Sequence, residues 1–154
     1  ALEGKVQIYL PDLKYVTAEY AEKYSGAADY PAAAQAAILE MFRQTGPCAY
    51  DESGLLKRGV VIRHLVLPGK LAEAKRVMDW VSEHFAPGEV LFSLMSQYIP
   101  WGRAAEFPEL NRRLRPSEAR AAAEYMDALG LEGFTQEPES AEQAYIPPFD
   151  LTGV

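Results

Sequence analysis

The stretch GVVIRHLVLPG, residues 59–69, is the part of the sequence that decides the fold. It is an almost unbroken apolar run that only Arg63 and His64 interrupt. Such a run is typical of a strand whose two faces are both covered, as they are in a parallel sheet. A Pro-Gly pair then turns the chain away from the strand. We therefore predict a buried strand of a parallel sheet at these residues.

The segments on either side of this run alternate between helical and strand patterns. Helices are predicted where apolar residues recur at helical spacing, and strands where short runs are rich in β-branched and aromatic residues. The expected strands are 5–11, 59–69, 88–100 and a short last one at 132–138, and the expected helices are 17–26, 30–46, 70–86 and 116–130. This alternation predicts an α/β fold of parallel β/α repeats.

Length, charge and cysteine content narrow the class of protein. The 154 residues match about one domain of roughly 150 residues, so we expect a single domain, 1–154. The net charge of -7 argues against general binding to nucleic acid or to anionic lipid. No apolar stretch approaches the roughly 20 residues that a membrane span needs. The one cysteine, Cys48, excludes an intrachain disulfide and favours a reduced, cytoplasmic setting.

Candidate ligand-binding side chains follow the strands, where α/β folds place their sites. Asp12 and Lys14 share one side of the first strand if that strand stays regular, and together they suit the two ends of a zwitterion. The alternative is an ion pair between the two. Arg63 lies within an apolar strand and needs an anion, a carbonyl or a structural partner such as Asp12. For the Asp12 and Lys14 pair and for Arg63, the ligand-binding and the structural interpretations both stay open.

Three further polar residues lie on or after these strands. His64 points away from Arg63, towards the covering helices, and is expected to be a satisfied core histidine. Gln97 could bind a base edge or a ribose, or a neighbouring loop, and Tyr98 takes the opposite face. The sequence contains no glycine-rich phosphate loop, no HExxH motif and no serine nucleophile elbow.

An ordered series of segments resembles a known family. The segments are VQIYLPDLKY, YSGAADYP, EMFRQTG, RGVVIRHLVLPG, SLMSQYIP, GFTQEPESA and IPPFDLTGV. In this order they resemble the C-terminal half of radical S-adenosylmethionine (SAM) proteins, and in particular the homologues of pyruvate formate-lyase activating enzyme. The resemblance covers nearly the whole chain.

The resemblance implies a (β/α)6 partial barrel of which this chain forms about strands four to six. Proteins of this family hold a [4Fe-4S] cluster and cleave SAM reductively to a 5′-deoxyadenosyl radical. The resemblance assigns Lys14 to the methionyl carboxylate and Asp12 to a neighbouring monovalent cation. It makes Arg63 the candidate catalytic residue, and it places Gln97 and Tyr98 near the adenosine.

The chain departs from the family in lacking two elements. The CxxxCxxC loop and the glycine-rich element of the second strand are both absent. Because the chain opens with Ala1 and is expected to enter a strand by about residue 5, we expect a cut N-terminus and a larger barrel whose N-terminal part is missing. Alone, this portion is expected to be inactive and to bind neither SAM nor the cluster tightly.

The expected partners follow from the same departure. A first strand that has lost its neighbour exposes an unpaired edge, which recruits another strand. We expect residues 5–11 to pair with the missing N-terminal half or with a second copy. A glycyl-radical enzyme is a further expected partner.

Two other functions stay open. Lys14 at a strand end could form a Schiff base, as in class I aldolases. The chain could also be a non-catalytic α/β binding domain, in which Asp12, Lys14 and Arg63 form only an ion-pair network.

Overall fold

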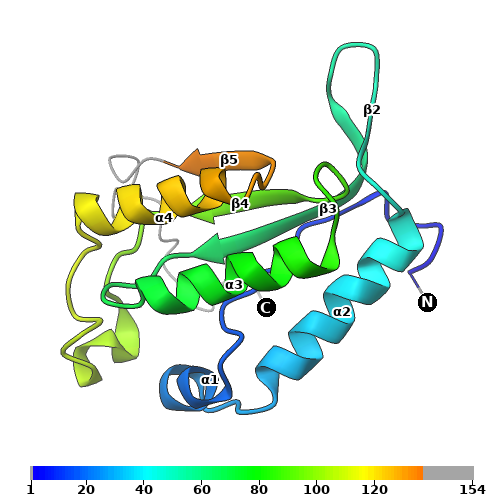
Figure 1. The fold of residues 1–154 in the computed structure, drawn as a ribbon. Coiled ribbons are helices and arrows are strands. Elements are labelled where there is room, and N and C mark those ends of the chain that lie inside the picture. The colour runs from blue at the N-terminus through cyan, green and yellow to red at the C-terminus, as the bar shows by residue number, and fades with distance from the viewer. Residues whose placement is uncertain (1, 137–154) are drawn as a thin grey trace, which may run out of the picture.

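A computed structural model describes residues 2–136, which form one sheet with helices packed against it (Figure 1). The strands are β1 (Ile8–Tyr9), β2 (Ala49–Tyr50), β3 (Leu56–Leu65), β4 (Leu91–Met95) and β5 (Gly133–Gln136). The helices are α1 (Ala18–Ser25), α2 (Tyr30–Thr45), α3 (Leu71–His84) and α4 (Pro116–Ala128), with a 3-10 helix, η1, at Gly102–Glu106.

The sheet has the order β1-β3-β4-β5, and these four strands are parallel. Val61 of β3 lies opposite Leu91 of β4, and Phe92 of β4 lies opposite Gly133 of β5. The predicted parallel sheet and the alternation of strands and helices are confirmed. β1 lies at one edge of the sheet, as predicted for the first strand.

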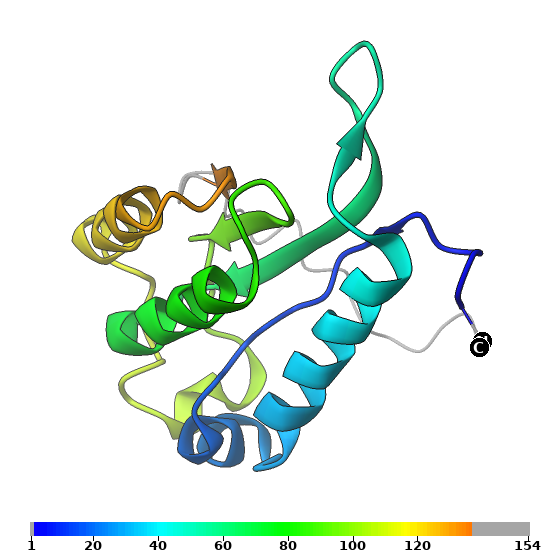
Figure 2. The ribbon, with the colours of Figure 1, turned by 45° about the vertical axis from the view of Figure 1, so that its right-hand side comes forward.

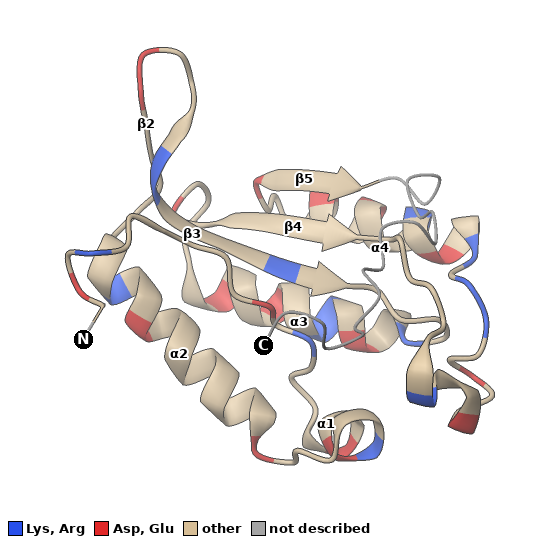
Figure 3. Cartoon of the chain, turned by 180° about the vertical axis from the view of Figure 1, so that it is seen from behind, with Lys and Arg blue, Asp and Glu red and all other residues tan. Residues whose placement is uncertain are grey.

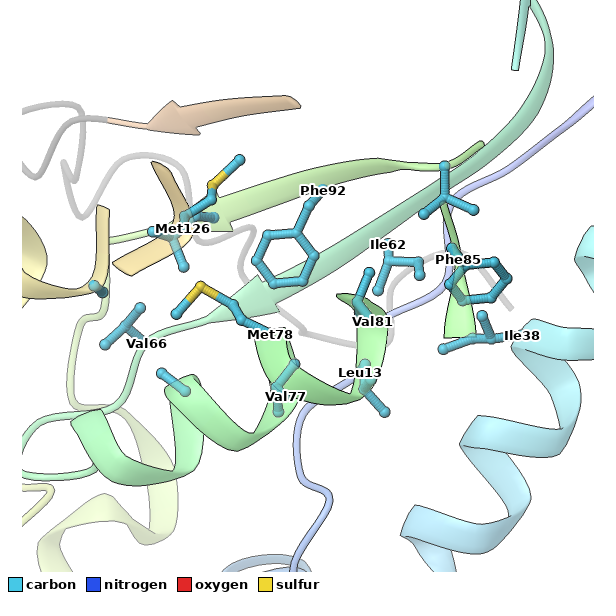
Figure 4. Packing of buried hydrophobic residues seen from close by; sticks show 14 of the residues in the cluster. Leu13, Ile38, Ile62, Val66, Val77, Met78, Val81, Phe85, Phe92 and Met126 are labelled. Atoms are coloured by element: carbon cyan, nitrogen blue, oxygen red, sulfur yellow. The ribbon is translucent and has the colours of Figure 1, made fainter. Parts of the chain in front are cut away.

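The hydrophobic core lies between the sheet and the helices (Figure 4). Ile62 of β3 and Phe92 of β4 are almost fully buried against Val77, Met78 and Val81 of α3. Side chains of α2 and α4 join the same cluster, so these helices cover one face of the sheet (Figure 2). Figure 3 shows the reverse view, in which β3 and β4 lie in front of α3.

The predicted helices agree closely with the observed ones because their end signals are strong. Pro31 stands in the first turn of α2, and Gly46 follows the helix with a φ of 69°. Gly26 ends α1 in the left-handed conformation, as expected of a glycine after a helix.

The segment 48–59, for which no strand was expected before residue 59, contains a strand of a hairpin. β2 pairs antiparallel with the beginning of β3, and a turn at the residues DESG (51–54) joins them, with Asp51 Oδ1 accepting from the Ser53 and Leu55 amides. Gly59 lets the two strands approach, because a Cβ there would lie 2.6 Å from Cys48 Sγ. β3 therefore begins three residues earlier than predicted and ends at Leu65.

The first strand is shorter than the predicted 5–11, and Pro11 accounts for part of the difference. Pro11 has no N–H to donate to a neighbouring strand. The pairing with β3 nevertheless continues beyond it, because Arg63 N donates to Pro11 O at 2.9 Å and Leu13 N donates to Arg63 O at 2.9 Å. These two bonds hold Asp12 directly beside Arg63.

Phe92 and Phe134 offer a matched test of the core. Phe92 is 1% exposed beneath the helices, whereas Phe134 on β5 is 48% exposed. We predict that Phe92→Ala lowers the free energy of unfolding by about 3–5 kcal/mol, through lost burial and a residual cavity. Phe134→Ala should change it by no more than about 0.5 kcal/mol. Urea denaturation monitored by circular dichroism measures both, and equal losses would contradict this description of the core.

Candidate functional site

Asp12 and Arg63 meet where β3 nears its carboxyl end. The two backbone bonds that flank Asp12 fix it opposite Arg63. Arg63 Nε then lies 2.8 Å from Asp12 Oδ1, with the two side chains 41% and 38% exposed. Because Ile62 and His64 are buried under the helices, Arg63 between them faces the opposite side of the sheet. The structural partner that the sequence suggested for Arg63 is thus confirmed.

This ion pair is incompletely hydrogen-bonded. Although Nε and Oδ1 are close, neither atom has a hydrogen-bond partner of acceptable geometry within residues 2–136, and both atoms are buried. The charge attraction is therefore present without a well-directed N–H···O bond. Exposed parts of both side chains stay accessible, so a guanidinium could meet an anion and a carboxylate could meet an amino group or a cation.

Lys14 extends the same edge but does not pair with Asp12. Its ammonium group makes no ion pair or hydrogen bond with another residue in the described part of the chain. Of the two interpretations left open, the Asp12–Lys14 ion pair is therefore not formed, and Asp12 pairs with Arg63 instead. Burial alternates along this segment: Tyr9, Leu13 and Tyr15 are buried, while Asp12 and Lys14 are more exposed. This alternation is the one expected if the two residues share a side, but Lys14 also lines a cavity that includes His64 and neither Asp12 nor Arg63.

Tyr30, at the start of α2, fixes the backbone between these two residues. Its hydroxyl donates to Asp12 O at 2.7 Å and accepts from the Lys14 amide at 3.0 Å. Burial raises the pKa of Tyr30, so the phenol keeps its proton and its donor role at neutral pH. No local sequence pattern indicates this contact, because it joins residues that are 16–18 positions apart.

Gln97 and Tyr98 follow β4 and are held by neighbouring loops and strands. Gln97 Nε2 donates to Gln136 Oε1, whereas Gln97 Oε1 is buried without a partner among residues 2–136. Tyr98 donates its hydroxyl to Leu110 O at 3.0 Å, and burial raises its pKa. No hydrogen bond or ion pair within the described residues joins either side chain to the Asp12–Arg63 pair.

Glu73 of α3 is a buried acid that sequence reasoning missed. Its carboxylate accepts from the Val16 amide at 2.7 Å, the Thr17 amide at 2.8 Å and the Thr17 hydroxyl at 2.5 Å. Thr17 occupies the N-cap position of α1, but its hydroxyl donates to Glu73 and does not cap the helix. The carboxylate thereby fixes the chain just after Lys14. The only sequence signal was an acid beside the apolar stripe of α3.

His64 is a core histidine, as predicted. It is 3% exposed, and its Nδ1 lies 2.8 Å from Leu13 O. Burial lowers the pKa of His64 below its usual value of about 6.5, so the ring is neutral at pH 7. The prediction that it is satisfied is only half correct, because Nε2 is buried and has no partner in the described part of the chain.

The described residues offer no metal centre. Among residues 2–136 there is no group of three or more His, Cys, Asp or Glu side chains able to hold a metal ion. Burial raises the pKa of Cys48, whose Sγ lies 3.9 Å from Val60 O, so the thiol stays protonated at neutral pH. These residues therefore do not fit an iron–sulfur cluster. None of the helices formed by these residues has the length and apolar character of a membrane span.

Comparisons with known proteins give one distant relative. The chain is 29% identical over 132 residues to the uncharacterized protein MJ0674 of Methanocaldococcus jannaschii. The match covers 85% of this chain but only 34% of the archaeal protein, so the chain spans about a third of the length of that relative. No protein-family model and no solved structure matches the chain.

Substitutions of Asp12 and of Glu73 should lower the free energy of unfolding by different amounts. We predict that Asp12→Asn changes the free energy of unfolding by less than about 1 kcal/mol, because the pair with Arg63 is half-exposed. Glu73→Gln should cost about 1.5–3 kcal/mol, since it weakens charge-assisted bonds in a buried place. Urea denaturation at pH 7 measures both changes. A cost for Asp12→Asn equal to that for Glu73→Gln would identify the Asp12–Arg63 pair as a structural element.

His64 should make stability depend on pH below about pH 6.5. The unfolded chain binds a proton near pH 6.5, whereas the folded chain resists protonation because the pKa of His64 is lowered. The unfolded state then binds more protons, so stability rises with pH through this window, by at most about 1.4 kcal/mol per pH unit. We predict that His64→Gln flattens this slope in urea titrations. The matched variant His84→Gln should retain it, and loss of the slope in His84→Gln would refute the assignment.

Proposed function

We propose that this chain is the C-terminal portion of a radical SAM enzyme and forms about strands four to six of a (β/α)6 partial barrel. The observation that carries the proposal is the Asp12–Arg63 pair. It lies towards the carboxyl end of parallel strands, on the face opposite the helices, and its buried atoms lack well-directed hydrogen bonds. This is the part of a β/α fold where ligands bind.

The proposed ligand is the zwitterionic methionyl group of SAM. The Lys14 ammonium, which has no acidic partner in the described residues, binds its carboxylate. Asp12 takes the neighbouring positive charge, either an amino group or a monovalent cation. Because Asp12 also attracts Arg63, a bound cation would weaken this attraction and leave the guanidinium free to face the reacting part of the ligand.

Gln97 and Tyr98 are proposed to approach the adenosine. Gln97 Oε1 is a buried acceptor without a partner in residues 2–136, so it suits an exocyclic amino group or a ribose hydroxyl. Tyr98 is already bound to Leu110 O and would contribute through its ring. When bound beside a reduced cluster, SAM supplies a 5′-deoxyadenosyl radical.

The cluster itself is proposed to lie in another part of the complete protein. Residues 2–136 do not fit an iron–sulfur cluster, and the sequence has one cysteine. The much longer archaeal relative is compatible with a larger protein, since the match covers only 34% of it. The edge strand β1 offers the backbone groups through which an N-terminal half-barrel, or a second copy, would continue the sheet. The substrate of the radical, such as a glycyl-radical enzyme, is a separate part of the proposal.

The test uses the protein expressed from its complete gene, reconstituted anaerobically with iron and sulfide. We predict that dithionite and SAM then yield 5′-deoxyadenosine, measured by liquid chromatography and mass spectrometry. Lys14→Met should raise the Kd for SAM at least tenfold, because it removes a charge-assisted bond to the carboxylate. The matched control is Lys5→Met, an exposed lysine that precedes β1.

The outcomes separate the proposal from its alternatives. A cluster-loaded protein that forms no 5′-deoxyadenosine would refute radical SAM chemistry. If 5′-deoxyadenosine forms but Lys14→Met binds SAM as tightly as Lys5→Met, the assignment of Lys14 is wrong. If SAM does not bind and Asp12→Asn affects stability strongly, the Asp12–Arg63 pair belongs to a non-catalytic binding domain.

A further inference from the structure

A cavity lies on the helix-covered side of the sheet, where α1 and the beginning of α3 meet the segment after β1. Its empty space is about 220 Å³, including a part that opens to solvent. Residues of four segments line it: the segment after β1, α1, β3 and the beginning of α3. The polar ones are chiefly Lys14, Tyr20, Tyr24, His64, Lys70 and Glu73. His64 and Arg63 are neighbours on β3 with opposite orientations, so this cavity is distinct from the Asp12–Arg63 pair.

His64, which lines the cavity, carries an unpartnered ring nitrogen. A carbonyl oxygen only accepts hydrogen bonds, so the 2.8 Å contact with Leu13 O places the imidazole proton on Nδ1. Nε2 then carries a bare lone pair, and it is buried without a partner within residues 2–136. Burial keeps the ring neutral. An unpaired buried acceptor costs free energy, which an O–H or N–H donor in the cavity would recover.

The charged groups around the cavity favour an anion. Lys14 and Lys70 are both basic, and Lys70 Nζ lies 4.8 Å from the Tyr20 ring centroid and 5.6 Å from that of Tyr24. The one acid in the lining, Glu73, already accepts three hydrogen bonds from residues 16 and 17 and lies 3.4 Å from an arginine. Lys70 also precedes the first turn of α3, whose positive end attracts negative charge.

The size of the cavity limits the ligand. Its enclosed part has room for about one water-sized group. A hydroxyl group is small enough for that part, whereas a carboxylate needs the space that opens to solvent. Larger rings do not fit the enclosed part.

We propose that this cavity binds a small carboxylate that carries a hydroxyl group, with the hydroxyl donating to His64 Nε2 and the carboxylate meeting Lys70. The two requirements come from separate residues, so each can be tested by itself. The site needs no iron–sulfur cluster and no SAM. Lys14 lines this cavity and is also the lysine proposed above to bind SAM, so the tests use His64 and Lys70, which have no part in that proposal.

Glycolate and acetate are the matched probes, because they differ only in the hydroxyl group. The protein from the complete gene is titrated with each by isothermal calorimetry at pH 7, while selectively ¹⁵N-labelled histidine reports on Nε2 by NMR. We predict that glycolate binds at least fivefold tighter than acetate and shifts the His64 Nε2 resonance. Lys70→Met should weaken both ligands at least fivefold, whereas Lys75→Met, also on α3 and placed 4.4 Å over the Tyr125 ring, should not.

Three results would overturn the proposal. Equal binding of glycolate and acetate would exclude the hydroxyl contact to His64. Binding of neither ligand, with an unchanged His64 resonance, would leave a cavity that only water occupies. Equal effects of Lys70→Met and Lys75→Met would exclude a specific role for Lys70.

Discussion

The helix-facing side of β3 is the constraint on which the other elements depend. This strand pairs with β1 on one edge and with β4 on the other, so its backbone groups are satisfied from both sides. Val60, Ile62, His64 and Val66 then have to be covered, and α2, α3 and α4 supply that cover. The same alternation sends Arg63 to the other face, where Asp12 is held opposite it by two backbone bonds. Alternate side chains of β3 therefore contribute to the core on one face of the sheet and to the candidate site on the other.

The sequence predicted those parts of the fold that depend on local patterns. The helices α2, α3 and α4 follow from apolar periodicity and from Pro and Gly at their ends. The parallel strands follow from the apolar run around Ile62. The hairpin was missed because β2 is only two residues long and depends on the close approach of Cys48 and Gly59, which no local pattern records. Whether the sheet belongs to a six-stranded barrel stays a prediction.

The candidate site was predicted less completely, because its contacts join distant segments. Alternation of side chains was enough to send Arg63 and His64 to opposite faces, but it did not show that Lys14 lines the same cavity as His64. Alternation could not show that Tyr30 fixes the backbone between Asp12 and Lys14. It also could not show that the Thr17 hydroxyl donates to Glu73 and does not cap α1. Long-range hydrogen bonds of this kind require the folded arrangement, since the partners are 16 to 57 residues apart.

The orientation of neighbouring residues on β3 also restricts how the gene could have changed in length. Gain or loss of one codon between Gly59 and Ile62 would shift the later residues by one position along the strand. The guanidinium of Arg63 would then enter the core, and the imidazole of His64 would leave it. The turn that joins β2 to β3 has no such restriction, because its side chains are not part of the sheet. Length variation among related genes is therefore compatible with this fold at residues 51–55 and not within the following strand.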